Sequence, residues 1–172
     1  MRVEAITDLV YSDGALYVAG LSNEEFASTL RVISFPFEKY ETATSIEIYH
    51  AAHKQYETHS PIRTLMTYQL DNKPHVLASY TCTPLVTFPV EKLENGVHPK
   101  GKTVAELGSG NRPLDMIAYK SNGKEFILMA NSNRSLMKIE PEDIVKQKES
   151  ITTPITERFR YERGAVYRCQ SG

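Results

Sequence analysis

Residues 113–123 read PLDMIAYKSNG, and this stretch decides how the rest of the chain is interpreted. A proline opens an apolar run that ends at Tyr119, and an Asn-Gly pair follows shortly after it. Asn-Gly supplies the positive φ angles that a two-residue hairpin turn needs. The next apolar segment, residues 126–130, is therefore expected to return as the second strand of a β-hairpin.

The same order of features recurs along the chain. A small residue or proline, then Ile or Leu, then a polar residue occur at positions 5–7, 61–63, 113–115 and 154–156. Each group is followed by a strand ending at a tyrosine, by turn residues and by a second apolar strand. Such self-similarity is the signature of a repeat architecture. Aligning the four groups predicts equivalent positions at Thr7, Arg63, Asp115 and Thr156.

Two further strands complete each copy of the repeat. The third strand runs to Pro36, Pro89 or Pro141, and each proline marks the strand's exit because it cannot donate to a sheet ladder. The fourth strand is expected at residues 44–49, 103–107 and 150–152. The mixed-charge residues 142–149 are expected to form an outer loop or one helical turn. No stretch shows sustained helical periodicity, so the predicted fold class is all-β.

A four-stranded repeat of this length resembles a blade of the β-propellers, in the class that includes the YVTN and NHL families. The resemblance implies a single partial propeller domain with about three and a half antiparallel blades. The approximate bounds of the blades are residues 1–49, 60–107 and 112–152, with an incomplete blade at 153–172. It also implies that the first strand of each blade lines a central channel. The Trp-Asp signature of WD40 repeats is absent, and the chain has no Trp.

An open arc of blades predicts a partner. Propellers usually close with about four to eight blades, and an open arc leaves unpaired strand edges at both ends. The chain could be part of a longer propeller, two copies could pair into a closed ring of about seven blades, or the sheets could form an open stack. The expected partner is therefore the remainder of a propeller or a second copy of the chain.

Composition excludes several functional classes. The net charge of −1 provides no global field for nucleic acid or an anionic membrane. No apolar run approaches the roughly 20 residues of a transmembrane helix, and the first residues contain no apolar core of a signal peptide. We therefore expect a soluble protein that binds neither nucleic acid nor membrane.

The connection between the first and second copies contains three of the five histidines: His50, His53 and His59. Neutral imidazoles are ligands for Zn, Cu and Fe, and three of them could hold a metal with one coordination position open. Glu57 lies between them and could be a fourth ligand or a base. The alternative is a polar loop whose histidines bond locally or face water.

The groups that open the second and third copies add charged residues. Arg63, Arg112 and Asp115 all lie near the start of a first strand, where the implied channel opens. An arginine and an aspartate across a channel could be an ion pair between blades. Alternatively, the two arginines could hold an anionic ligand through bidentate hydrogen bonds.

Two functional hypotheses remain open from sequence. The first is a non-catalytic module, part of a larger propeller, that binds a small molecule or a protein on the channel-mouth face. The second is a metal-dependent or redox enzyme with a histidine-based site at that mouth. A third interpretation, a truncated piece with no independent function, predicts no cooperative unfolding of the isolated chain.

Overall fold

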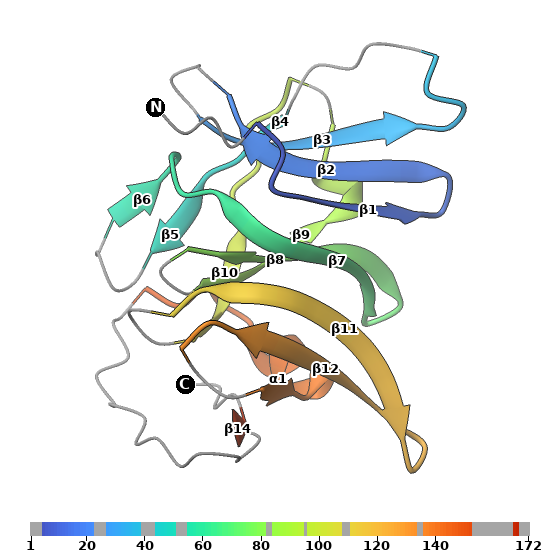
Figure 1. The fold of residues 1–172 in the computed structure, drawn as a ribbon, viewed down its shortest axis with the longest axis vertical. Coiled ribbons are helices and arrows are strands. Elements are labelled where there is room, and N and C mark those ends of the chain that lie inside the picture. Colours follow the sequence, from blue (N-terminus) through green and yellow to red (C-terminus); the bar gives the residue numbers. More distant parts are fainter. Residues whose placement is uncertain are drawn as a thin grey trace.

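The computed structural model of this chain is an all-β structure of stacked sheets (Figure 1). It describes residues 5–22, 27–38, 44–50, 55–81, 84–94, 96–107, 111–133, 136–152 and 167–168. Three four-stranded sheets follow one another along the sequence, and a two-stranded sheet separates the first from the second. All the paired strands are antiparallel except β13 and β14.

The first sheet has the order β1-β2-β3-β4 and consists of β1 (Asp8–Ser12), β2 (Ala15–Leu21), β3 (Ser28–Ser34) and β4 (Thr44–Ser45). The small sheet pairs β5 (Ile48–His50) with β6 (Gln55–Glu57). The second sheet consists of β7 (Ile62–Leu70), β8 (Lys73–Tyr80), β9 (Pro84–Pro89) and β10 (Lys102–Glu106). The third consists of β11 (Pro113–Ser121), β12 (Lys124–Asn131), β13 (Met137–Ile139) and β14 (Tyr167–Arg168).

Two-residue turns join the first two strands of each large sheet, as the sequence predicted. Both residues of every turn have positive φ: Asp13 and Gly14, Asp71 and Asn72, and Asn122 and Gly123. This geometry matches the right-handed twist of the flanking strands, which is why Asp, Asn and Gly occupy these positions. The prolines also behave as predicted, since β3, β9 and β13 all end at or shortly before one.

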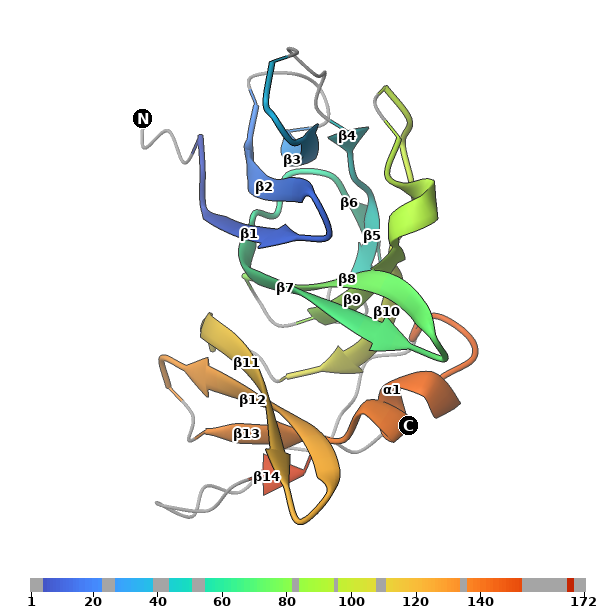
Figure 2. The same ribbon diagram turned by 90° about the vertical axis from the view of Figure 1, so that its right-hand side faces the viewer.

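The second sheet lies in the middle of the stack, between the first and third (Figures 1 and 2). One apolar cluster joins it to the first sheet through residues such as Tyr17, Leu30 and Phe88. A second cluster joins it to the third sheet through residues such as Leu77, Met129 and Ile139. Because both of its faces are covered, the second sheet carries buried apolar residues on both sides.

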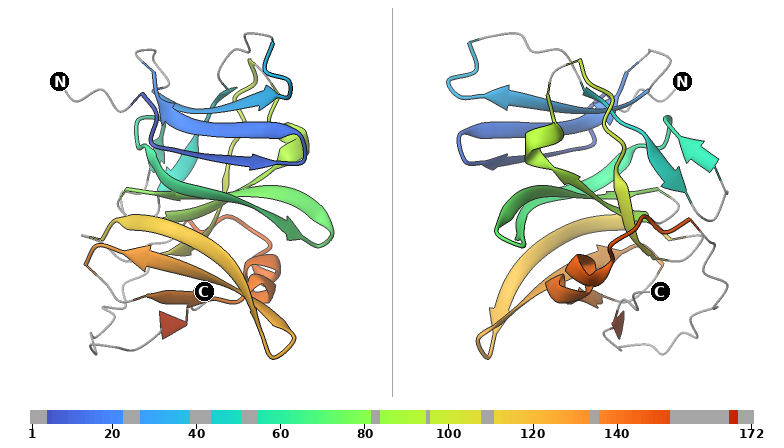
Figure 3. Two further views of the ribbon diagram at one scale, coloured as in Figure 1. Left: turned by 45° about the vertical axis from the view of Figure 1, so that its right-hand side comes forward. Right: turned by 180° about the vertical axis from the view of Figure 1, so that it is seen from behind.

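The first strands of the three sheets lie side by side, with β7 in contact with both β1 and β11 (Figure 3). Asp8 strengthens one of these contacts, because its Oδ2 accepts a 2.7 Å hydrogen bond from the backbone N–H of Leu65. The N–H of Leu65 lies just after a bulge in the pairing of β7 with β8. β7 is the edge strand of the second sheet, and this donor is satisfied by a residue of the first sheet.

Two of the predicted fourth strands are wrong in detail. Residues 44–49 do not form one strand but divide between β4 and the small sheet. Residues 150–152 do not join the third sheet. The N–H of Ile151 instead donates to the carbonyl of Thr103 over 2.9 Å, so this segment follows the edge of β10 in the second sheet. Within the described residues, the fourth place in the third sheet belongs to β14, which pairs in parallel with β13.

A short helix, α1 (Pro141–Lys146), follows β13 and packs beside the second and third sheets (Figure 2). Pro141 occupies the first turn, where a missing N–H costs nothing, and Glu142 and Asp143 lie near the positive end of the helix dipole. Ile144 is buried in the second apolar cluster and anchors the helix. The predicted helical turn is therefore confirmed. In the part of the chain that is described, no helix has the length and apolar character needed to cross a membrane.

Candidate functional site

The stack has two ends at which a site could form. At the entry end the strands β7 and β11 begin, and at the turn end the three two-residue hairpins reverse the chain (Figure 1). The sequence placed its candidate residues at the entry end. The described clefts lie at both ends, and the two ends differ in chemistry.

Arg63, Arg112 and Asp115 do lie at the entry end, on neighbouring strands. Arg63 is the second residue of β7 and is half-buried, whereas Arg112 directly precedes β11 and is exposed. Asp115 is exposed on β11, and its Oδ1 accepts a 2.8 Å hydrogen bond from the N–H of Met116. The backbone N–H of Arg112 donates to Ser132 Oγ at 3.0 Å. Their role as a ligand set stays a prediction.

The predicted equivalence of Arg63 and Asp115 is wrong by one residue. Ile62 pairs with Tyr80 and Thr64 with Ser79 in the second sheet. Pro113 pairs with Asn131 and Asp115 with Ala130 in the third. Asp115 therefore corresponds to Thr64, and Arg63 corresponds to Leu114. The cause is that Pro113, which the sequence alignment placed before the strand, takes the place of Ile62. Thr156 lies outside the described residues.

Little of the histidine cluster falls within the described residues. The backbone of His50 ends β5, His53 lies outside the described residues, and His59 Nδ1 lies 3.1 Å from the hydroxyl of Thr58. Glu57 accepts a 2.6 Å hydrogen bond from Ser60 Oγ. Within the described ranges, no three His, Cys, Asp or Glu residues gather closely enough to hold a metal. The metal site stays a prediction.

His59 nevertheless lines a cleft of about 530 Å³ at the entry end. Its lining comes from β6, from the connection to β7 and from one residue after β8: Gln55, Tyr56, Glu57, Thr58, His59, Ser60, Pro61 and Thr81. Tyr56 packs edge-to-face on Tyr49, with their ring centroids 5.1 Å apart, and Lys100 Nζ lies 4.5 Å from the Tyr56 ring centroid. The insertion between the first two repeats therefore contributes most of the lining of this cleft.

A buried asparagine organises the entry end of the third sheet, and sequence reasoning treated its segment only as a loop. Asn111 is 2% exposed, and its Nδ2 donates to Asn131 Oδ1 at 2.7 Å. Asn111 Oδ1 accepts from the N–H of Asn133, and Asn131 Nδ2 donates to the carbonyl of Met129. These bonds join the segment before β11 to the segment after β12, so their role is to hold the fold.

At the turn end, two adjoining clefts form a groove across the sheets, which we call the turn-end groove. The first cleft has a volume of about 340 Å³ and lies between the hairpins of the first and second sheets. The second has a volume of about 540 Å³ and lies between the second sheet, the third sheet and α1. Tyr68, Gln69 and Glu125 line both clefts. The groove therefore joins elements that are far apart in the sequence.

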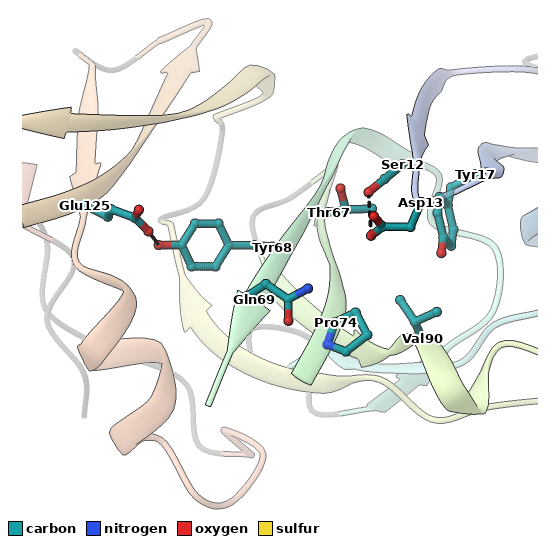
Figure 4. A pocket seen from close by; sticks show the side chains of 9 residues that line it. All are labelled: Ser12, Asp13, Tyr17, Thr67, Tyr68, Gln69, Pro74, Val90 and Glu125. Carbon is teal, nitrogen blue, oxygen red and sulfur yellow. Dashed lines mark hydrogen bonds between the residues drawn. The ribbon is translucent and has the colours of Figure 1, made fainter. Parts of the chain in front are cut away.

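Tyr68 lines both clefts and reaches from β7 to Glu125 of β12 (Figure 4). Its hydroxyl donates a 2.7 Å hydrogen bond to Glu125 Oε2. Burial, followed by the hydrogen bond and charge of Glu125, raises the pKa of Tyr68 to about 12. Burial and the nearby Asp13 also raise the pKa of Tyr17, which lines the first cleft. Both phenols stay protonated at neutral pH and can donate or accept hydrogen bonds.

The rest of the lining mixes apolar residues with charged side chains of both signs. The cations of the second cleft are Lys120, Lys124 and Lys146, and the anions are Asp71, Glu125 and Glu142. Lys120 Nζ is 3.9 Å from Glu125 Oε1, and Lys146 Nζ is 3.0 Å from Asp143 Oδ1. Sequence reasoning assigned the hairpin turns and the tyrosines to scaffold because they recur in every copy, and it interpreted residues 142–149 as an outer loop or one helical turn. The sequence signal for the turn-end groove was the recurrence of the hairpins, because equivalent hairpins in successive copies lie at the same end of the stack.

Comparison of the chain with models of protein families and with curated proteins finds no match. What the molecule does therefore has to be argued from its own geometry.

Proposed function

We propose that the chain is a non-catalytic protein-binding module built from blades of the β-propeller kind, and that its turn-end groove takes an extended segment of a partner polypeptide. The observation that carries this proposal is the groove itself, which runs across three sheets and includes a described hydrogen bond between two of them. Its two clefts fall within the range of about 300–1,000 Å³ in which ligand sites usually lie.

The chemistry of the groove suits a peptide better than an apolar small molecule. Hydroxyl, amide, carboxylate and ammonium groups line it beside apolar residues, and Ser12, Gln69, Glu125 and Lys124 represent these polar groups. An extended peptide offers backbone N–H and C=O groups and side chains of both charges, so it can satisfy such a mixture. The exposed position of Gln69 in both clefts makes it the natural point of contact.

Binding is favoured over catalysis because the phenol at the centre of the groove has a pKa far from neutrality. A general acid or base works best when its pKa lies near the working pH. Tyr68 has a pKa of about 12, so it stays neutral and hydrogen-bonds to Glu125. Its hydrogen bond to Glu125 therefore gives it a structural role, which is to define the shape of the groove.

The propeller interpretation is supported by the way the sheets stack. Three consecutive four-stranded sheets pack face to face, and their first strands lie next to one another. The order of strands from β7 to β10 runs from one edge of the sheet to the other, as in a blade. In that arrangement β1, β7 and β11 would line the channel, and the turn-end groove would lie at one of its openings.

Selection of short random peptides on the immobilised chain, followed by affinity measurement, tests the groove. The selected peptides are expected to bind the Gln69→Arg variant more than tenfold more weakly, because a bulky cation fills the junction of the clefts. The matched control is Gln55→Arg, at an equally exposed glutamine of the entry-end cleft. Loss of binding in the control variant alone would move the site to the entry end, and enrichment of no peptide would contradict the proposal.

A further inference from the structure

Three exposed aromatic side chains gather at the turn end of the first sheet. Tyr11, Phe35 and Phe37 are 56%, 65% and 47% exposed. The ring centroids of Phe35 and Phe37 are 5.5 Å apart, those of Tyr11 and Phe37 are 6.4 Å apart, and both pairs pack edge-to-face. We call these three residues the aromatic patch. Single exposed apolar residues are normal on a protein surface, whereas a cluster of exposed rings indicates an interaction site.

Backbone hydrogen bonds hold the aromatic patch beside the turn that joins β1 to β2, next to the end of β3 (Figure 1). The N–H of Phe35 donates to the carbonyl of Gly14 at 2.8 Å, and the N–H of Phe37 donates to the carbonyl of Ser34 at 2.8 Å. Asp13 belongs to the same turn and lines the first cleft of the turn-end groove. The aromatic patch and that cleft therefore share one hairpin.

The backbone of Phe37 points to a role outside the fold. Its φ is +67°, a left-handed conformation that bulky residues rarely adopt and that glycine adopts without strain. Such strained residues are common at binding sites, where the surrounding structure holds them in place. At this position the strained residue carries a half-exposed ring of the aromatic patch.

The repeat does not require a ring at the position of Tyr11. Counted from the hairpin turns, Tyr11 of β1 corresponds to Gln69 of β7 and to Lys120 of β11. The same position is therefore an amide in the second sheet and an ammonium in the third. Tyr11 belongs to the particular surface of the first sheet and not to the scaffold that all three sheets share.

The first sheet is the acidic part of the chain. Residues 5–38 contain five Asp or Glu residues and one basic residue, whereas residues 39–172 contain 15 acidic and 18 basic residues. The one basic residue is Arg31, and its Nε is buried. Glu38 follows the aromatic patch directly and is exposed, and Lys39 lies outside the described residues.

The first cleft of the turn-end groove has the same sign of charge. The charged residues in its lining are Asp13 and Glu125, both carboxylates. Asp13 is exposed and accepts a 3.1 Å hydrogen bond from Ser12 Oγ, whereas Glu125 has Lys120 Nζ at 3.9 Å on the side of the second cleft. A partner that reaches from this cleft to the aromatic patch therefore meets carboxylates and exposed rings.

Arginine is the side chain that suits both features. Its guanidinium group stacks on aromatic rings and bonds to carboxylates in a bidentate geometry. Lysine offers a compact, strongly hydrated charge that stacks less well. An apolar segment would take water from the carboxylates without giving them a partner.

We infer that the partner segment contains arginine, and that it continues from the first cleft over the first hairpin onto the aromatic patch. Its guanidinium groups stack on Tyr11, Phe35 and Phe37 and pair with the carboxylates on either side of the hairpin. This inference rests on the proposed peptide-binding function, because it names the kind of segment that the groove takes.

Fluorescence anisotropy with three labelled peptides tests the chemistry of the partner. The peptides alternate proline with arginine, lysine or glutamate over about twelve residues, since proline favours an extended chain. The full chain is expected to bind the arginine peptide about tenfold more tightly than the lysine peptide and the glutamate peptide least of all. Equal binding of the arginine peptide and either of the others, or no binding up to roughly 1 mM, would overturn the inference.

Substitutions in the aromatic patch test its position. Phe37→Gly removes a ring but suits a positive φ, so it should keep the turn and bind the arginine peptide about tenfold more weakly. Tyr11→Thr should act in the same direction, and Tyr56→Thr is the matched control, at a tyrosine 55% exposed on β6 at the entry end. Asp13→Asn should weaken binding and make it less dependent on salt. Thermal unfolding by circular dichroism checks that each variant is folded, and wild-type affinity in Phe37→Gly would overturn the inference.

The Gln69→Arg variant separates this inference from the proposed function, with Gln55→Arg as the control for the added charge. If Gln69→Arg weakens binding of the arginine peptide and Phe37→Gly does not, the groove alone takes the peptide and the inference is wrong. The reverse pattern would contradict the groove and support the aromatic patch as the arginine site. Light scattering covers the remaining occupant: a wild-type dimer that Phe37→Gly abolishes would assign the aromatic patch to a second copy and overturn the inference.

Discussion

Replacement of Gly101 by alanine examines how tightly the second sheet is packed at its edge. Gly101 directly precedes β10, and its N–H donates to the carbonyl of Glu47 at 2.9 Å, which joins the end of the first repeat to the second sheet. A Cβ at Gly101 would overlap Val86 Cγ1 and would lie 2.6 Å from Phe88 Cζ. Neither neighbour can move aside easily, because Val86 and Phe88 are both fully buried.

The expected cost follows from these contacts. Overpacking of a well-packed core costs about 1–3 kcal/mol, and the lower chain entropy of alanine in the unfolded state returns about 0.4–1 kcal/mol. The Gly101→Ala variant should therefore lose roughly 1–2 kcal/mol in its free energy of unfolding. With an m-value of about 2 kcal/mol/M, the urea midpoint should fall by roughly 0.5–1 M.

Urea unfolding followed by circular dichroism measures this loss, since the chain has no Trp to report by fluorescence. Phe88→Leu removes the ring that the new methyl group meets, so it should partly rescue Gly101→Ala and give a coupling of about 1 kcal/mol in a double-mutant cycle. Gly96→Ala is the matched control, because its φ is +79° and its Cβ would meet nothing within 4 Å. It should lose stability through its backbone alone and show no coupling to Phe88→Leu. A Gly101→Ala chain as stable as wild type would refute the packing argument.

Three further predictions concern Tyr68 in the turn-end groove, the buried Asn111 and the insertion that contains the histidines. The raised pKa of Tyr68, about 12 against an ordinary 10, means that its contribution to stability is complete below pH 10 and is lost as the pH rises from 10 to 12. The melting temperature of the Tyr68→Phe variant should therefore fall less steeply over that window. Asn111→Ala should cost about 1–3 kcal/mol in urea unfolding, because Asn131 loses its partner inside the fold, and a change under about 0.5 kcal/mol would contradict that role. If the insertion binds Zn, Cu or Fe, elemental analysis of untagged protein should find about one equivalent, and less than roughly a tenth, with no uptake on titration, would exclude the site formed by His50, His53 and His59.

The local elements were largely predictable from sequence because their causes are local. Asn122 and Gly123 specify a turn with two positive φ angles whatever the surroundings, and alternating apolar residues beside such a turn can only be hairpin strands. Pro141 and the acids after it specify the start of α1 in the same way. These features depend on residues a few positions apart, so the repeat could be recognised and the all-β class predicted.

The candidate site was less predictable, because it depends on register and on contacts between sheets. Pro113 takes the place of Ile62 at the start of the first strand, and this one-residue shift changes which side chains correspond between the two sheets. The edge of β10 accepts residues 150–151 because Thr103 offers its carbonyl there, which no local pattern reveals. The turn-end groove joins Ser12, Tyr68 and Glu125 from three sheets.

The sequence by itself thus determined the repeat, its hairpins and the all-β class, since each follows from turn chemistry and strand alternation within one copy. Only the tertiary structure decided which faces are covered, how the copies align to the residue, and that Tyr68 meets Glu125. The physical reason is that stacking brings together residues some fifty positions apart. Burial, hydrogen bonds and pKa values all depend on that stacking.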